Sequence, residues 1–159
     1  MHQLRESRWS LLTIPLALGL VVATASLAPA ADLTSGMTTG KLELKSAGPL
    51  AFGPEGILFV GDPQAASITA IATGDVGPRS SGKLEVEAID QKVAARLGTS
   101  ADQIEIVDLA VNPLSGAGYL SVARGKGPDA MAVLVRVDST GEVKELDTDE
   151  ITFATAALP

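Results

Sequence analysis

The stretch GPLAFGPEGILFVGDP, residues 48–63, decides how the fold is interpreted. Two short apolar runs, Leu50–Phe52 and residues 57–60, flank the Gly-Pro-Glu-Gly segment at 53–56. Because proline fixes one backbone angle and glycine permits a positive φ, this segment suits a tight turn. A phosphate-binding loop needs a helix after its glycines, and here an apolar run follows. The stretch therefore predicts a β-hairpin.

The hairpin belongs to a repeated pattern. The motif Leu-Ala-x-x-Pro begins at Leu50 and recurs at Leu109, 59 residues later. The motif Gly-Lys-Leu-Glu begins at Gly40 and recurs at Gly82, 42 residues later. The 17-residue difference between these two spacings indicates an insertion between the second copies of the two motifs.

The insertion, residues 89–103, is predicted to be helical. Apolar residues recur at helical spacing over residues 89–97, and Gly98 follows as a stop signal. Ser100 and Gln103 have the spacing of a capping box, which predicts a further helical turn. The apolar helical positions are Ile89, Val93, Ala94 and Leu97.

The remaining segments are predicted strands in two units of four. In each unit the first two strands are apolar and the last carries charges on alternate positions. This gradient is typical of a propeller blade, whose inner strand is buried and whose outer strand faces water. Ile104–Val111 is mostly apolar, as is a strand buried on both faces. Blade one (50–88) has strands at Leu50–Phe52, 57–60, Ser67–Ala72 and 83–88, and blade two (104–146) has strands at 105–111, 119–123, Met131–Val137 and 142–146.

The predicted fold class is all-β: two four-stranded propeller-like blades, an incomplete β-propeller, with one short inserted helix near 89–97. A generic β-sandwich is the alternative. An orphan strand is expected at 41–45, resembling the outer strand that completes a last blade, and residues 147–159 are expected to start a further element, with a strand at 151–153.

Known propellers have about four to eight blades, so the chain is expected to be a fragment of a longer propeller. The alternatives are a ring assembled from several copies and two sheets that pack together as a self-sufficient domain. Unclosed blades leave unpaired strand edges, which predict self-association.

Residues 1–31 are predicted to be a signal peptide. Arg5 and Arg8 give a positive start, residues 11–22 form an apolar run, and the small residues at 28–30 suit a cleavage site. An uncleaved membrane anchor is the alternative, but two prolines interrupt the ~20 apolar residues that a span requires. The expected product is a periplasmic or extracellular domain of residues 32–159, with no membrane contact after cleavage.

Removal of the leader limits the available chemistry. His2 and Trp9 leave with it, and the chain has no cysteine. A Ser-His-Asp triad, a cysteine nucleophile, a His- or Cys-ligated zinc site and a disulfide framework are therefore excluded. The remaining chain has 10 basic and 18 acidic residues, a net charge of −8, which disfavours nucleic acid and anionic membranes. Keeping an exported protein soluble is the better explanation of this acidity.

The residues 49–62, PLAFGPEGILFVGD, resemble the blade signature of NHL-type and gluconolactonase-like β-propellers. The chain is also similar to uncharacterised exported bacterial propeller proteins over residues 108–129, and the resemblance as a whole covers residues 41–146. It implies the N-terminal part of such a propeller. Gluconolactonase-like enzymes bind a divalent metal through Glu, Asn and Asp side chains on several blades, and no complete ligand set is matched here.

Two acidic residues and one basic loop are the candidate sites. Asp62 ends a strand and Asp108 lies in an inner strand, so either could bind calcium near a channel, although turn capping is the alternative. Arg124 and Lys126 form a local basic cluster in a loop, which predicts an anion or partner site or else a solvated loop. No catalytic or cofactor-binding residue is identified.

The functional hypothesis is an exported, non-catalytic binding or scaffold module with an unknown protein or small-molecule ligand. The alternative is part of a metal-dependent lactonase-like hydrolase whose remaining site residues lie in missing sequence.

Overall fold

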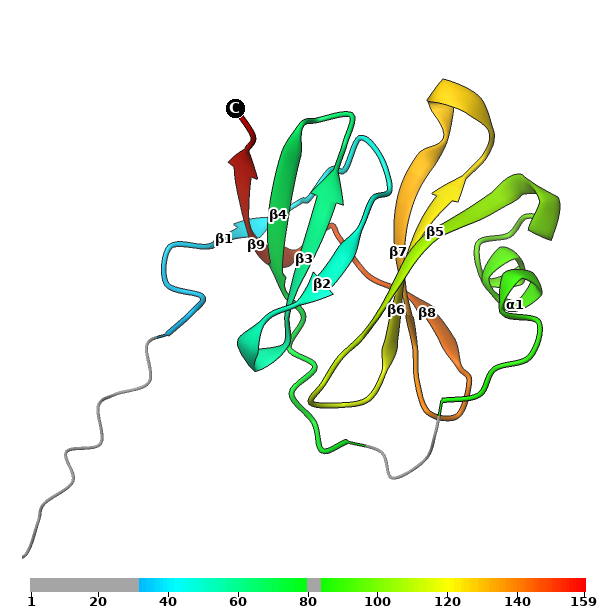
Figure 1. The fold of residues 1–159 in the computed structure, drawn as a ribbon, viewed down its shortest axis with the longest axis horizontal. Coiled ribbons are helices and arrows are strands. Elements are labelled where there is room, and N and C mark those ends of the chain that lie inside the picture. Colours follow the sequence, from blue (N-terminus) through cyan, green and yellow to red (C-terminus); the bar gives the residue numbers. More distant parts are fainter. Residues whose placement is uncertain (1–31, 80–83) are drawn as a thin grey trace, which may run out of the picture. The chain divides into compact units, whose positions relative to one another are not determined.

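The described part of the chain is mostly β, with two antiparallel sheets. The structure is a computed structural model that describes residues 32–79 and 84–159; the predicted signal peptide lies outside the described residues. Sheet A has five strands in the order β1-β9-β4-β3-β2, and sheet B has four in the order β5-β6-β7-β8 (Figure 1). The strands are β1 Thr38–Gly40, β2 Leu50–Phe52, β3 Ile57–Asp62, β4 Ser67–Ala72, β5 Ile104–Val111, β6 Gly118–Arg124, β7 Met131–Val137, β8 Val143–Glu145 and β9 Ile151–Ala157, and the α-helix is α1, Ile89–Arg96.

Sheet B is the meander expected for the second unit. Each of its strands pairs antiparallel with the next one along the chain. The prediction that Ile104–Val111 is buried on both faces is wrong, because β5 is an edge strand whose residues after Ile104 alternate between exposed and half-buried. A β-bulge between Ile106 and Asp108 shifts its register.

Sheet A begins with the hairpin predicted from residues 48–63. The turn between β2 and β3 is a short 3-10 segment, Pro54–Gly56, with Glu55 at φ 54° and Gly56 at φ 72°. Gly53 N–H donates to the carbonyl of Ile57 at 2.8 Å and closes the turn. The tight turn predicted at residues 53–56 is therefore confirmed.

The fourth strand of this sheet differs from the prediction. No described residue of 83–88 lies in a strand; β9 pairs antiparallel with β4 over six residue pairs instead. Leu84 and Val86 pack against the apolar cluster beside helix α1. The start of the predicted strand, residue 83, falls in the undescribed segment 80–83. The strand predicted at 151–153 is part of β9, which lies between β4 and β1 in sheet A.

The orphan strand predicted at 41–45 is also absent, since none of these residues belongs to a strand. The short β1 precedes them and pairs with Ile151–Phe153 of β9. Leu42 is 6% exposed and belongs to the core, and its N–H donates to the carbonyl of Thr148 at 2.8 Å. The alternation of residues 41–45 therefore reflects a buried leucine in an irregular segment.

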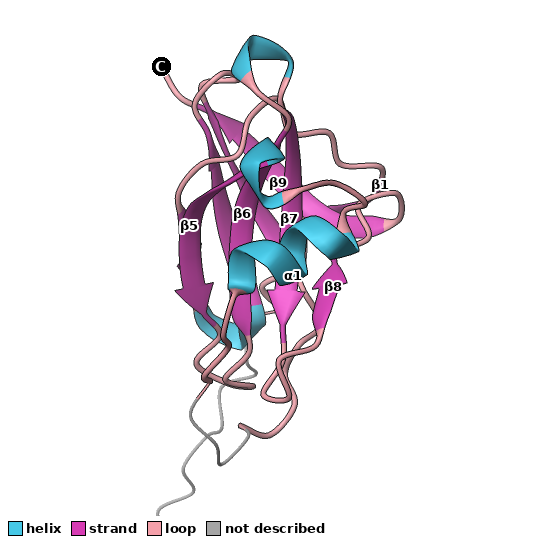
Figure 2. Cartoon of the chain, turned by 90° about the vertical axis from the view of Figure 1, so that its right-hand side faces the viewer, coloured by secondary structure: helices cyan, strands magenta, loops and turns pink. Residues whose placement is uncertain are grey.

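Two apolar clusters hold three layers together. The inter-sheet core joins sheet A to one face of sheet B, and the helix-side core joins the other face of sheet B to α1 (Figure 2). The buried residues of the inter-sheet core are Leu42, Leu58, Val60, Ile71, Ala117, Tyr119, Leu134 and Ile151. Those of the helix-side core are Val93, Ala94, Leu97, Ile104, Leu120, Val122, Val133, Val135 and Val137.

Helix α1 confirms the helical insertion. Val93, Ala94 and Leu97 are buried in the helix-side core. Gly98 follows the helix at φ 67°, the left-handed conformation that favours glycine after a helix. A 3-10 turn at Ala101–Gln103 confirms the further helical turn, but Ser100 makes no side-chain cap bond, so the capping box is wrong.

Candidate functional site

The outer face of sheet A, the face turned away from sheet B, is uncharged, and it is apolar around Phe59 and Ile68. Cross-strand partners share a face, so strand pairing shows which residues lie there. Phe59 is 39% exposed, Ile68 is 41% exposed, and both are surrounded by alanine and glycine. The outer-face residues in this region are Ala51, Phe59, Gly61, Ile68, Ala70, Ala154 and Ala156. Towards β1 the same face carries Thr39 and Thr152, whose hydroxyls are hydrogen-bonded to each other at 2.8 Å.

A groove of about 430 Å³ runs over this face. Its lining extends from Pro49 beside β2 to Leu158 beyond β9, which is 51% exposed. The ionisable residue in the lining, Asp62, is 2% exposed and its carboxylate is hydrogen-bonded. The lining residues are Pro49, Leu50, Ala51, Phe59, Gly61, Asp62, Pro63, Ser67, Ile68 and Leu158.

One edge of β9 adjoins this groove. β9 has seven residues, and within the described residues β1 pairs with Ile151–Phe153 alone on its outer side. The remaining four residues of the strand, from Ala154 to Ala157, are exposed. Their backbone therefore offers an open strand edge next to an apolar surface.

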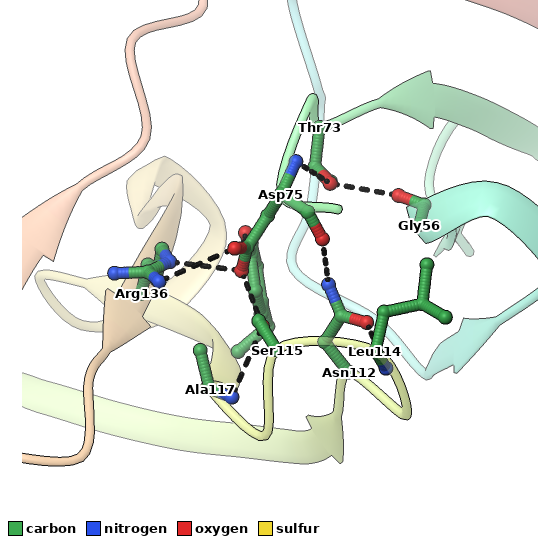
Figure 3. Close-up of polar contacts among 9 residues, drawn as sticks. Gly56, Thr73, Asp75, Asn112, Leu114, Ser115, Ala117 and Arg136 are labelled. Atoms are coloured by element: carbon green, nitrogen blue, oxygen red, sulfur yellow. Dashed lines mark hydrogen bonds and ion pairs between the residues drawn. The ribbon is translucent and has the colours of Figure 1, made fainter. Parts of the chain in front are cut away.

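A polar cluster centred on Asp75 lies where the chain leaves sheet A (Figure 3). Its Oδ2 accepts hydrogen bonds from Ser115 Oγ at 2.7 Å, Arg136 Nε at 3.0 Å and Tyr119 Oη at 3.1 Å. The Asp75 backbone carbonyl accepts a bond from Asn112 Nδ2 at 2.7 Å. Since Ser115, Tyr119 and Arg136 belong to sheet B and its β5–β6 turn, the cluster ties the segment after β4 to sheet B.

The cluster continues on the sheet A side. Thr73 Oγ1 donates to the carbonyl of Gly56 at 2.7 Å and accepts a bond from Asp75 N–H at 3.2 Å (Figure 3). Gly56 lies so close to this segment that an added Cβ would meet the Asp75 carbonyl oxygen at 3.2 Å. The β2–β3 turn is thereby connected, through Asp75, to sheet B.

The electrostatics of the cluster favour a fixed charge over proton transfer. Burial acts to raise the pKa of Asp75, but hydrogen bonds from Arg136 and Ser115 and the charge of Arg136 outweigh it and lower the pKa. Burial and the neighbouring Asp75 charge raise the pKa of Tyr119 to about 12. At neutral pH Asp75 is therefore a carboxylate and Tyr119 a neutral phenol. Neither group is poised near pH 7 as a general base or acid.

The structure places Asp62 in a structural role. Its Oδ2 accepts from Lys45 N–H at 2.6 Å, and its Oδ1 accepts from Ser46 Oγ at 2.7 Å and Ala65 N–H at 3.0 Å. Burial acts to raise the pKa of Asp62, but these hydrogen bonds together lower it. The carboxylate fixes the segment before β2 to the β3–β4 turn.

Asp108 joins the two sheets. Its Oδ2 accepts a hydrogen bond from Leu50 N–H, and its Oδ1 accepts one from Leu109 N–H, both at 2.8 Å. Ser121, directly opposite Asp108 in sheet B, donates its hydroxyl to the carbonyl of Gly48 at 2.7 Å. Asp108 and Ser121 therefore anchor the start of β2 on sheet B.

The two metal candidates do not form a common site with other ligands. Among the described residues, no group of three or more His, Cys, Asp or Glu side chains is arranged to hold a metal ion. In the same part of the chain, every buried side-chain nitrogen or oxygen has a hydrogen-bond partner. No orphaned polar atom there indicates a bound ion.

The basic loop lies at the turn between β6 and β7. Arg124 ends β6 and Lys126 precedes a 3-10 turn at Gly127–Asp129, and both side chains belong to exposed residues. Gly125 lies between them at φ 97° and donates its N–H to the carbonyl of Gln103 at 2.8 Å. The two cations therefore occupy an exposed hairpin turn.

The Asp75 cluster was not predicted from the sequence, although the sequence contains one signal of it. Arg136 is a charged residue inside the apolar strand Met131–Val137. A charge at a largely buried position normally has a partner of opposite sign. The signal predicts a partner but does not identify Asp75, which lies 61 residues away.

Within the described residues, no helix combines the length and the apolar character that a membrane crossing requires. Comparisons with protein-family models, with curated proteins and with solved structures found no match.

Proposed function

We propose that this chain is an exported, non-catalytic binding or scaffold module whose contact surface is the outer face of sheet A. The observation that carries the proposal is the exposed apolar groove over this face, which holds Phe59, Ile68 and Leu158 in contact with solvent. Exposed apolar grooves of this kind are typical of sites where another molecule binds.

The chemistry of the groove favours a partner that presents an uncharged, apolar surface. Asp62 is hydrogen-bonded and buried, so a partner meets carbon atoms and not charge. The alanines and glycine around Phe59 and Ile68 leave the face nearly flat, which suits a partner that presents a strand or a sheet.

The proposal includes a relation to propeller blades. Sheet B is a four-stranded meander, and β2, β3 and β4 form a three-stranded meander to which β9 returns as the next strand. In a propeller, each blade packs its face against the next blade. The outer face of sheet A is the position at which a further blade-like sheet would pack. Resemblance to NHL-type and gluconolactonase-like propellers is consistent with this arrangement.

The alternative of a metal-dependent hydrolase gains no support from its two candidates. The carboxylates of Asp62 and Asp108 bind backbone amides that fix turns and sheet contacts.

Binding of Nile red, an uncharged dye of apolar surfaces, tests the proposal. In the double variant Phe59→Ser/Ile68→Ser the groove loses its two large side chains. We expect at least about tenfold weaker dye binding, since burying each such side chain contributes about 1.5–3 kcal/mol. Circular dichroism establishes that the variant is folded.

The matched control is Val76→Ser/Met131→Ser, which removes two apolar side chains that are 61% and 62% exposed elsewhere. This control should bind the dye as the wild type does. Unchanged dye affinity in the Phe59/Ile68 variant, or an equal loss in the control, would refute the proposal.

A further inference from the structure

The open edge of β9 has a defined hydrogen-bonding pattern. Leu158 N–H donates to the carbonyl of Ala66 at 2.7 Å, so its backbone faces the β4 side of the strand. Successive residues of a strand alternate in direction, so Ala154 and Ala156 also face β4. Thr155 and Ala157 therefore face outward. Among the described residues no strand pairs with them.

The β9 edge also lacks the features that protect strand edges. Exposed edges are commonly guarded by charged residues, proline or a bulge. The β5 edge carries Glu105 and a bulge, and β8 carries Lys144. The sequence of β9, ITFATAA, contains no charge and no proline, and its pairing with β4 has no register shift.

The described residues before β1, 32–37, leave this edge open. Continued upstream, the β1 register would place Met37 opposite Ala154. A turn intervenes, in which Met37 N–H donates to the Thr34 carbonyl at 2.9 Å and Ser35 N–H donates to the Asp32 carbonyl at 3.1 Å. Residues 32–37 are thus folded into turns and do not extend β1.

We infer that a second copy of this chain pairs with the open edge of β9, antiparallel and about a two-fold axis. This inference goes beyond the proposed function, because the second copy binds the β9 edge and leaves the outer face of sheet A exposed. Identical edges fit such an axis because the same residues serve on both sides of the interface. Ala and Thr side chains allow two strands to approach without a clash or a buried charge.

One register pairs both outward-facing residues of each copy at once. The facing residues must be those that face outward, and Phe153 is already paired with Thr38 of β1. Thr155 of each copy therefore pairs with Ala157 of the other, and the two Ala156 residues lie opposite each other on the axis. The two A sheets become continuous, and their apolar outer faces form one larger surface.

Single cysteines test this register, and the chain has no native cysteine to interfere. Residues opposite each other without mutual hydrogen bonds lie about 4.5 Å apart at Cα, close enough for a disulfide after small adjustment. The Ala156→Cys variant, purified after expression with its own leader, should form a disulfide-linked dimer on mild oxidation. The matched variants Ala154→Cys and Thr155→Cys should form at least about tenfold less, because neither lies opposite itself.

A second variant removes the edge without disturbing the fold. Ala157→Pro deletes an outward N–H, which β4 does not use, and proline is tolerated at edge positions. Combined with Ala156→Cys, it should reduce the dimer at least about tenfold, with the circular dichroism spectrum unchanged.

Equal cross-linking at the three positions, no cross-linking at Ala156→Cys, or cross-linking that survives Ala157→Pro would overturn the inference. If Nile red binding depends on Phe59 and Ile68 while Ala156→Cys stays monomeric, the second-copy inference fails and the proposed contact surface stands. If Nile red binding does not depend on them while Ala156→Cys forms the dimer, the proposed surface fails and the edge pairing stands.

Discussion

Replacement of Asp75 by alanine is expected to weaken the connection between the two sheets. The substitution removes the acceptor of Ser115, Tyr119 and Arg136 together. It leaves the Thr73–Gly56 hydrogen bond and the backbone carbonyl bond of Asn112 chemically intact. The experiment therefore tests the carboxylate and not the whole segment.

The expected loss of unfolding free energy is about 3–5 kcal/mol. A hydrogen bond to a charged group contributes about 1.5–3 kcal/mol, and a buried donor left unpaired costs about 1–3 kcal/mol. Tyr119 is 1% exposed and cannot recover a water partner, whereas the Arg136 side chain is 29% exposed and can be hydrated. The Arg136 contribution is therefore the smaller part of the loss. A change of this size is a large fraction of the 5–15 kcal/mol that stabilises a typical domain.

Urea unfolding followed by far-ultraviolet circular dichroism measures the change. Glu43→Gln is a matched control, because it also breaks an ion pair, the one with Lys41. The two side chains are 77% and 62% exposed, so the unfolding midpoint of this variant should equal that of the wild type. The difference between wild type and Asp75→Ala should also shrink as the pH falls below about 4, since the lowered pKa of Asp75 gives stability that is lost on protonation. A loss under about 1 kcal/mol at pH 7, or one equal to that of Glu43→Gln, would refute the structural role.

Two further predictions concern individual groups. Tyr119 is the one tyrosine of the chain, so absorbance at 295 nm reports its ionisation alone. Its pKa of about 12 predicts that ionisation in the folded protein starts well above pH 10. The free energy of unfolding should be constant below about pH 10 and fall towards pH 12, by about 3 kcal/mol in total, because the unfolded chain ionises first. A titration midpoint near pH 10 in the folded protein would contradict this prediction. Asp62→Ala removes three hydrogen bonds and should cost about 2–4 kcal/mol in urea unfolding. Millimolar calcium should leave the melting temperature of the wild type unchanged, and a calcium-induced rise that disappears in Asp62→Ala would show instead that this carboxylate binds the ion.

Local patterns predicted the elements well because local physics determines them. The 53–56 turn and the Ile89–Arg96 helix depend on backbone preferences and on spacing within a few residues. The four strands of sheet B follow one another in the chain and pair with their sequence neighbours, so their order also follows from short connections.

The candidate site was harder to predict because it depends on contacts distant in sequence. Residues 57–60 are apolar on both faces of the strand, which indicates that both faces need cover. Leu58 and Val60 are covered by the inter-sheet core, while Phe59 remains exposed. The sequence pattern predicts that both faces of the strand pack against other parts of the protein. It does not show which of the two faces stays exposed.

Residues 83–88 were predicted to be the strand next to β4, but β9 has that place. The difference shows what an alternating pattern can and cannot specify. Alternation fixes which side chains share a face, but not which edge a segment joins. β9 has side chains that fit next to β4 in sheet A. Ile151 and Phe153 contribute to the inter-sheet core, and the hydroxyl of Thr155 is hydrogen-bonded to that of Thr69 at 2.9 Å.

The apolar side chains of the other segment serve a different surface. Leu84 and Val86 pack against the helix-side core, on the face of sheet B that sheet A does not cover. Because β9 follows sheet B in the chain and lies next to β4, sheet A is complete only when the chain has passed through sheet B and returned. Residues 32–159 therefore form one compact unit, in which a strand from its last part belongs to the first sheet.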